Sequence, residues 1–116
     1  MRDSQKDLFR KILGKSGEAS ALRYLKREGY SLVEKNYRTP FGEADLIVRK
    51  EELVFVEVKT RSSDSYGVPS EAVGYKKRET YRKIASYWFL SHEEEPFRFD
   101  VVEILGKKLN HIQNAF

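Results

Sequence analysis

The segment Leu53-Val54-Phe55-Val56-Glu57-Val58-Lys59-Thr60-Arg61 has the pattern of a β-strand at the centre of the protein, interrupted by charges. Side chains alternate between the two faces of a strand, so the three valines share one face. The other face carries Phe55, Glu57 and Lys59 in one row. This row indicates either a solvated strand face with an internal ion pair or a functional site inside the protein.

The preceding segment, residues 42–50, repeats the pattern. Alternation predicts Glu43 and Asp45 on one face and Ala44 on the other. A three-residue turn over 50–52 would place Asp45 beside Glu57 and Glu43 beside Lys59, whereas a two-residue turn would not. Glu43 is then either a further ligand or a partner of Lys59. Facing carboxylates need a cation to stay ionised, and oxygen ligands favour Mg²⁺ or Mn²⁺ over zinc.

A third acid, Glu18, lies at helical spacing with Leu22 and Leu25, on the face that must pack. It either reaches the same site or stays solvated at the positive end of a helix. Asp100 lies among aromatic and branched residues, and we expect a structural role in which it caps, pairs with Arg98 or another base, or supports the sheet.

The wider pattern predicts one domain over residues 1–116 with the element order α-βββ-α-ββ. A short amphipathic segment around Leu8 precedes a helix that runs to Gly29. A polar loop over 62–67 and a helical turn at Pro69 follow the third strand. The spacing of hydrophobic residues predicts five strands, over 30–38, 42–50, 53–61, 97–105 and 109–116. It predicts a second helix over 75–90. On the second helix, one row forms the predicted core face: Tyr81, Ile84, Ala85 and Trp88.

Composition excludes several classes of protein. The 116 residues are 40% hydrophobic, enough for one domain with a core. The absence of cysteine excludes a disulfide scaffold and a thiolate zinc site, and two histidines exclude a histidine-rich metal site. No apolar run approaches the roughly 20 residues that span a bilayer, so we expect no membrane segment and a cytoplasmic location.

The net charge of +4 is concentrated on the predicted helix over 75–90. Its five cations oppose one acid, Glu79, so the remaining chain sums to zero. This concentration predicts phosphate contacts with nucleic acid, although a solvated basic face is the alternative. The candidate nucleic-acid-binding residues on this helix are Lys76, Lys77, Arg78, Arg82 and Lys83. Arg61, where the strand over 53–61 passes into the polar loop, is a further candidate.

An Asp on one strand followed by Glu-x-Lys on the next, here Asp45 and Glu57-Val58-Lys59, resembles the PD-(D/E)xK nuclease superfamily. Further motifs resemble the uncharacterised bacterial YraN-like family, which is related to archaeal Holliday junction resolvases. These motifs are Gly17-Glu18, Asn36-Tyr37-Arg38, Gly42-Glu43-Ala44-Asp45-Leu46-Ile47, Val54 to Arg61, Phe99-Asp100-Val101-Val102 and His111 to Phe116.

The resemblance implies a restriction-endonuclease-like α/β fold, with a mixed central sheet of about five strands flanked by helices. It implies four catalytic residues, Glu18, Asp45, Glu57 and Lys59. Mg²⁺ (or Mn²⁺) would be bound by Asp45, Glu57, the Val58 carbonyl and Glu18. Related resolvases are small dimeric domains, which makes a homodimer an expectation.

These observations support three function hypotheses. The first is a metal-dependent nuclease that hydrolyses phosphodiester bonds in DNA, including branched DNA. The second is an inactive module that binds DNA or RNA through the basic helix. The third is a protein-interaction adaptor that uses Tyr66, Tyr75 and residues 112–116 as its contact surface.

Overall fold

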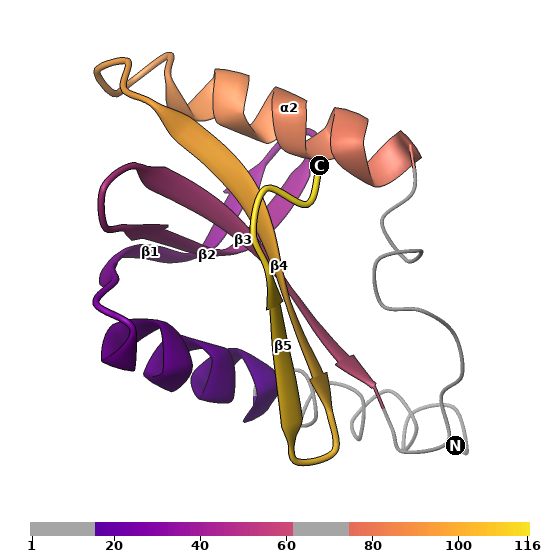
Figure 1. The fold of residues 1–116 in the computed structure, drawn as a ribbon. Helices are drawn as coiled ribbons and strands as arrows, with labels where there is room; N and C mark the ends of the chain where they lie inside the picture. The colour runs from indigo at the N-terminus through magenta and orange to yellow at the C-terminus, as the bar shows by residue number, and fades with distance from the viewer. Residues whose placement is uncertain (1–15, 62–74) are drawn as a thin grey trace.

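The computed structural model describes residues 16–61 and 75–116, which form a five-stranded sheet with a helix on each face (Figure 1). The strands follow one another across the sheet in chain order. All neighbouring pairs are antiparallel except β3 and β4, which are parallel. The strands are β1 (Ser31–Thr39), β2 (Gly42–Arg49), β3 (Leu53–Arg61), β4 (Phe97–Leu105) and β5 (Lys108–Ile112). The predicted α/β class, mixed sheet and element order are confirmed.

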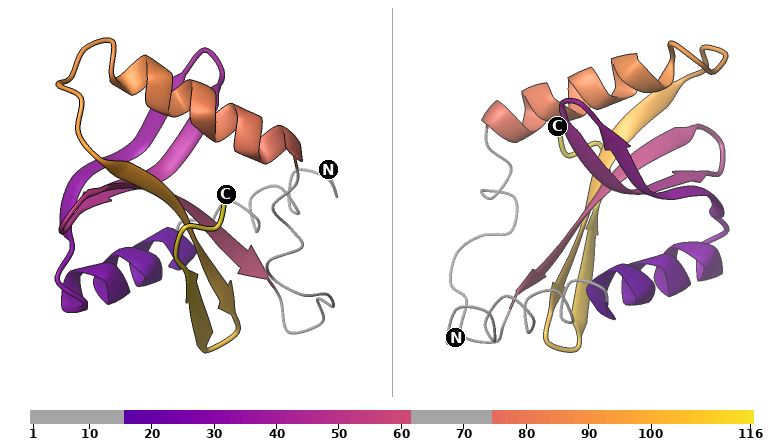
Figure 2. Two further views of the ribbon diagram at one scale, coloured as in Figure 1. Left: turned by 45° about the horizontal axis from the view of Figure 1, so that its top comes forward. Right: turned by 180° about the vertical axis from the view of Figure 1, so that it is seen from behind.

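The parallel pair β3 and β4 explains the position of the second helix. Parallel neighbours need a crossover over one face of the sheet, and here the crossover contains α2 (Tyr75–Trp88). The N-terminal helix, residues 16–27, covers the opposite face (Figure 2). Among the described helices, none is long and apolar enough to cross a membrane.

Each face of the sheet has its own core. Val54 and Val56 pack in the cluster under the N-terminal helix, with Ala21 and Leu25. Leu53 and Phe55 pack in the cluster under α2. The alternation predicted for β3 is therefore confirmed. So is the core face of α2, because its four predicted residues are buried: Tyr81, Ile84, Ala85 and Trp88.

The β2–β3 hairpin has the register that the three-residue turn predicted. Arg49 pairs with Leu53, and the ladder continues to the pair of Leu46 and Val56. The prediction of strict alternation along β2 is wrong at Ala44, which packs under α2 together with Ile47. The interruption lies opposite Asn36, whose φ of 50° departs from extended backbone. Asp45 therefore occupies an irregular part of the sheet.

The end of the chain differs from the prediction. The last strand was predicted over 109–116, but β5 ends at Ile112 because the chain turns and Asn114 has a φ of 52°. Phe116 then packs against Tyr81, with ring centroids 5.0 Å apart. The predicted segment around Leu8, the loop over 62–67 and the helical turn at Pro69 lie outside the described residues.

Candidate functional site

Asp45 lies where the β2–β3 ladder stops pairing. Its Oδ2 accepts a hydrogen bond from the Val58 backbone N–H at 2.8 Å, so the carboxyl group faces β3. The pKa of Asp45 is raised from 3.8 to about 7, first by burial and second by the negative charge of Glu57. Glu57 is thus close enough to act on the Asp45 carboxyl, as the register of the hairpin requires.

Glu57 is only 8% exposed, and two side chains of α2 hold its carboxylate. Lys77 Nζ lies 3.1 Å from Oε1, and the Tyr81 hydroxyl donates to Oε2 at 2.5 Å. Tyr81 is fully buried, and burial together with the Glu57 charge raises the pKa of its hydroxyl well above the usual range. Tyr81 therefore stays protonated and acts as a hydrogen-bond donor.

Glu18 reaches this region because the N-terminal helix starts against β3. A Cβ atom on Gly17 would lie 1.9 Å from the Thr60 Oγ1, so a larger residue would force the helix away. Glu18 follows directly, and its charge is among those that raise the pKa of Asp45. The charge of Glu18 thus acts on Asp45, and its role as a ligand stays a prediction.

Asn36 joins Glu18 to Glu43. The orientation of its amide follows from its surroundings, with the nitrogen toward the two acids. In that orientation it donates to Glu18 Oε1 at 2.8 Å and to Glu43 Oε1 at 2.9 Å. Glu43 also lies 3.8 Å from Arg38 and adds to the negative potential at Asp45. The carboxylates of Glu18, Glu43 and Glu57, from the N-terminal helix, β2 and β3, thus all add negative potential at the carboxyl group of Asp45.

Lys59 and Arg61 follow Glu57 on the same face of β3. Lys59 is half-buried and lies opposite Glu103 in the parallel register with β4. Arg61 Nε lies 2.7 Å from Glu103 Oε1, and Glu103 is only 3% exposed. Arg61, which the sequence assigned to nucleic acid, therefore neutralises a buried acid of its own chain.

The cations of α2 have different surroundings. Lys77 faces Glu57, as described above. Arg82 pairs with Glu79 at 3.1 Å, and Lys83 lies 5.7 Å from the centroid of the Phe41 ring. Four of the five predicted nucleic-acid-binding residues of this helix are exposed: Lys76, Arg78, Arg82 and Lys83. The helix can present these four charges to a polyanion.

The predicted ligands can be tested for their fit to a metal ion. In residues 16–61 and 75–116, no three acidic or histidine side chains are already spaced as a metal site. The donor chemistry nevertheless fits a hard divalent cation, since carboxylate oxygens and the Val58 carbonyl are its preferred ligands. Burial is the first cause of the raised pKa of Asp45, and the negative charges of Glu57, Glu18 and Glu43 add to it. A divalent cation would supply the balancing charge and favour the ionised form.

Asp100 belongs to a separate, structural network. It is fully buried and accepts hydrogen bonds from Arg98 at 2.9 Å and from the Asn114 backbone at 2.9 Å, and it pairs with His111 at 2.7 Å. Burial acts to raise the pKa of Asp100, but the hydrogen bonds from His111 and Arg98 outweigh it and hold the pKa below its usual range. Of the alternatives that the sequence leaves open for Asp100, pairing with Arg98 agrees with these contacts.

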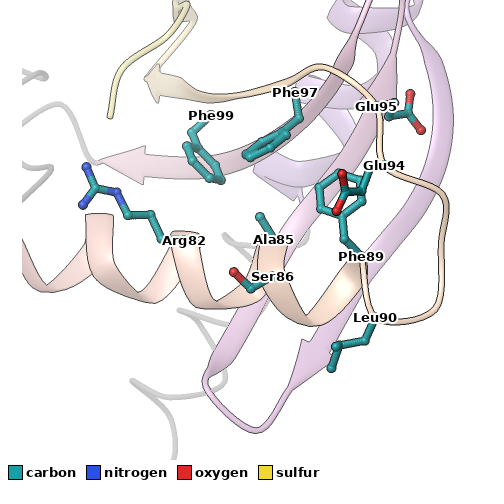
Figure 3. A pocket seen from close by; sticks show the side chains of 9 residues that line it. All are labelled: Arg82, Ala85, Ser86, Phe89, Leu90, Glu94, Glu95, Phe97 and Phe99. Carbon is teal, nitrogen blue, oxygen red and sulfur yellow. The ribbon is translucent and has the colours of Figure 1, made fainter.

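A hollow of about 670 Å³ lies between the C-terminal half of α2 and the start of β4, and its lining includes neither Asp45 nor Glu57. Figure 3 shows its aromatic lining, which includes Phe89, Phe97 and Phe99. A smaller hollow of about 240 Å³ adjoins Glu18 and Asn36. The candidate site is defined by the contacts among the carboxylates, because neither of these two hollows is lined by Asp45, Glu57 or Lys59.

Sequence reasoning missed the contacts that α2 makes with Glu57. Tyr81 was assigned to the core and Lys77 to nucleic acid, although their spacing of four residues puts them on one side of a helix. Glu103 was also missed, but the signal was available, since it interrupts an apolar strand just as Glu57 does. Asn36 carried no such signal, because its role depends on a positive φ.

Comparison with known proteins gives the family. A family model described as "Uncharacterised protein family UPF0102" matches residues 17–104. The chain belongs to this family. UPF0102 is the YraN-like family that the sequence motifs resemble. The matched range includes Glu18, Asp45, Glu57 and Lys59.

Individual UPF0102 relatives match over almost their whole length. A UPF0102 protein of Thermodesulfovibrio yellowstonii is 47% identical over 106 residues, which cover 90% of this chain and 95% of the relative. One from Alkaliphilus oremlandii is 46% identical over 115 residues, which cover 91% of this chain and 98% of the relative. One from Clostridioides difficile is 45% identical over 108 residues, which cover 89% of this chain and 95% of the relative.

Proposed function

We propose that this UPF0102 protein is a metal-dependent endonuclease of the PD-(D/E)xK type, which hydrolyses phosphodiester bonds in DNA. The observation that carries the proposal is the position of Asp45 against Glu57, beside the backbone of Val58. A pair of acids that is largely withdrawn from water costs free energy, so its presence in the middle of two strands is more typical of a site than of a scaffold.

Each residue has a part in the proposed reaction. Asp45, Glu57 and the Val58 carbonyl would hold Mg²⁺ or Mn²⁺, with Glu18 as a further ligand. The bound cation would lower the pKa of a water molecule and neutralise the scissile phosphate. Lys59, next along the same face of β3, would orient that water and stabilise charge on the phosphate. Attack of the water oxygen on phosphorus would form one P–O bond and break the bond to the 3′-oxygen. The attacking water would lose a proton to solvent and the departing oxygen would take one up, which gives a 3′-hydroxyl and a 5′-phosphate.

Exposed cations of α2 would position the substrate. Lys76, Arg78, Arg82 and Lys83 would contact phosphates, which gives affinity without reading bases. Branched DNA is the proposed substrate class, and a homodimer the proposed assembly, since two sites could then act on two strands. A cytoplasmic location is part of the same proposal.

The test compares cleavage of linear, flap and four-way DNA in the presence of Mg²⁺ or Mn²⁺. Glu57→Ala and Lys59→Ala are expected to lose about 10²-fold or more in rate. Glu51→Ala and Lys107→Ala, which change exposed turn residues, are the matched controls and should cleave like the wild type. Equal cleavage by the wild type, Glu57→Ala and Lys59→Ala would overturn the proposed mechanism.

A second candidate is an inactive module that binds DNA or RNA. The observation that favours it is the exposure of four cations on one helix. Binding that weakens steeply with salt, without cleavage under any divalent cation, would select this function over the nuclease. The adaptor hypothesis has less support, because Phe116 packs against Tyr81 and Phe99 within its own chain.

A further inference from the structure

We propose that Lys77 competes with a divalent cation for the Glu57 carboxylate, so that α2 sets the affinity of the site for metal. This inference rests on the proposed function. It concerns how the site is loaded, and it assigns to Lys77 a task other than the phosphate contact expected from its place in the basic helix.

The geometry of Glu57 is the first step. Both of its oxygens are engaged by α2, Oε1 by the Lys77 ammonium at 3.1 Å and Oε2 by the Tyr81 hydroxyl at 2.5 Å. A cation that bridges Asp45 and Glu57 needs at least one of these oxygens. Each oxygen keeps a second lone pair, but a cation bound at Oε1 would lie against the positive charge of the Lys77 ammonium, so binding there favours displacement of that ammonium.

The second step is to ask which contact can be exchanged. Tyr81 is fully buried among core residues of α2 and cannot leave Oε2 without opening the core. The Lys77 side chain is 39% exposed, and its flexible stem can turn into solvent. The exchangeable oxygen is therefore Oε1, while Tyr81 keeps hold of Oε2 and fixes the orientation of the carboxylate.

The third step concerns charge. Lys77 brings one positive charge to Glu57, whereas Asp45 is subject to the negative charges of three carboxylates, Glu57, Glu18 and Glu43. A divalent cation between Asp45 and Glu57 serves both acids, which favours the exchange. The released Lys77 then joins the exposed cations of α2, so that metal binding and phosphate binding support each other.

The test measures Mn²⁺ affinity by isothermal titration calorimetry on the full chain, without nucleic acid. Lys77→Met removes the competitor and is expected to bind Mn²⁺ about fivefold more tightly, equivalent to about 1 kcal/mol for a partly exposed ion pair. Lys76→Met removes the same charge from the neighbouring, exposed position and serves as the control for general electrostatics. Lys77→Arg keeps the charge and should restore an affinity near that of the wild type.

Thermal unfolding gives a second reading of the same competition. Added Mn²⁺ should raise the unfolding temperature of Lys77→Met more than that of Lys76→Met, because a tighter ligand stabilises more. Equal Mn²⁺ affinity in the two methionine variants, or weaker binding in Lys77→Met, would overturn the competition while leaving the metal site in place. Failure of every variant and of the wild type to bind Mn²⁺ would overturn the metal site itself.

Discussion

Replacing Asp45 with Asn should stabilise the protein, and increasingly so as the pH rises. The folded pKa of Asp45, about 7, lies above its usual value of 3.8. The native state therefore binds more protons than the unfolded state between these values, and stability falls as the pH rises through that window. At about 1.4 kcal/mol per pKa unit, ionisation costs at most about 4 kcal/mol by pH 8, and about 0.5 kcal/mol at pH 4. Asn removes this cost and can still accept the Val58 N–H.

The measurement is urea unfolding at several pH values between about 4 and 8, followed by the fluorescence of the single, buried Trp88. The advantage of Asp45→Asn over the wild type should grow across this range. Asp100→Asn is the matched control with the opposite sign, because the pKa of Asp100 is lowered and its ionised form stabilises the fold. A difference between Asp45→Asn and wild type that stays flat with pH would refute the reasoning about the facing acids.

Three further outcomes are expected. Tyr81→Phe leaves a buried Glu57 oxygen without its donor and should cost about 1–3 kcal/mol in urea unfolding, whereas Tyr87→Phe, at an exposed position, should cost little. Arg98→Met leaves Asp100 without its main cation and should cost about 3 kcal/mol, and a loss below that of Tyr87→Phe would contradict the assigned network. Replacing two exposed cations of α2, Lys76 and Lys83, with Gln should weaken DNA binding and reduce the slope of affinity against salt by about 2 in fluorescence anisotropy. An unchanged slope would remove α2 from the DNA interface.

Much of the fold followed from local patterns in the sequence. Period-two alternation over residues 53–61 placed β3 and both of its faces, because a fully packed strand leaves little freedom in its register. The three-residue turn then fixed the β2–β3 pairing, and with it the approach of Asp45 to Glu57. These inferences worked because each depended only on residues that are close in the sequence.

The parts that failed depend on contacts between distant elements. Ala44 changed face where β2 lies opposite Asn36, whose positive φ no hydrophobic pattern reveals. The contact of Lys77 with Glu57, at 3.1 Å, joins α2 to β3, and charge patterning within the helix does not reveal it. The bend after Ile112, which returns Phe116 to Tyr81, likewise depends on the tertiary contact that it makes.

The central claim, that Asp45 and Glu57 form one cation site, is tested most directly by crystals of the protein soaked in Mn²⁺ and measured for anomalous scattering. The claim predicts a peak about 2.1 Å from an oxygen of each carboxylate, with Tyr81 still bonded to Glu57 and Lys77 turned away. An ion bound elsewhere, or no peak between Asp45 and Glu57 at a Mn²⁺ concentration that supports cleavage, would contradict it.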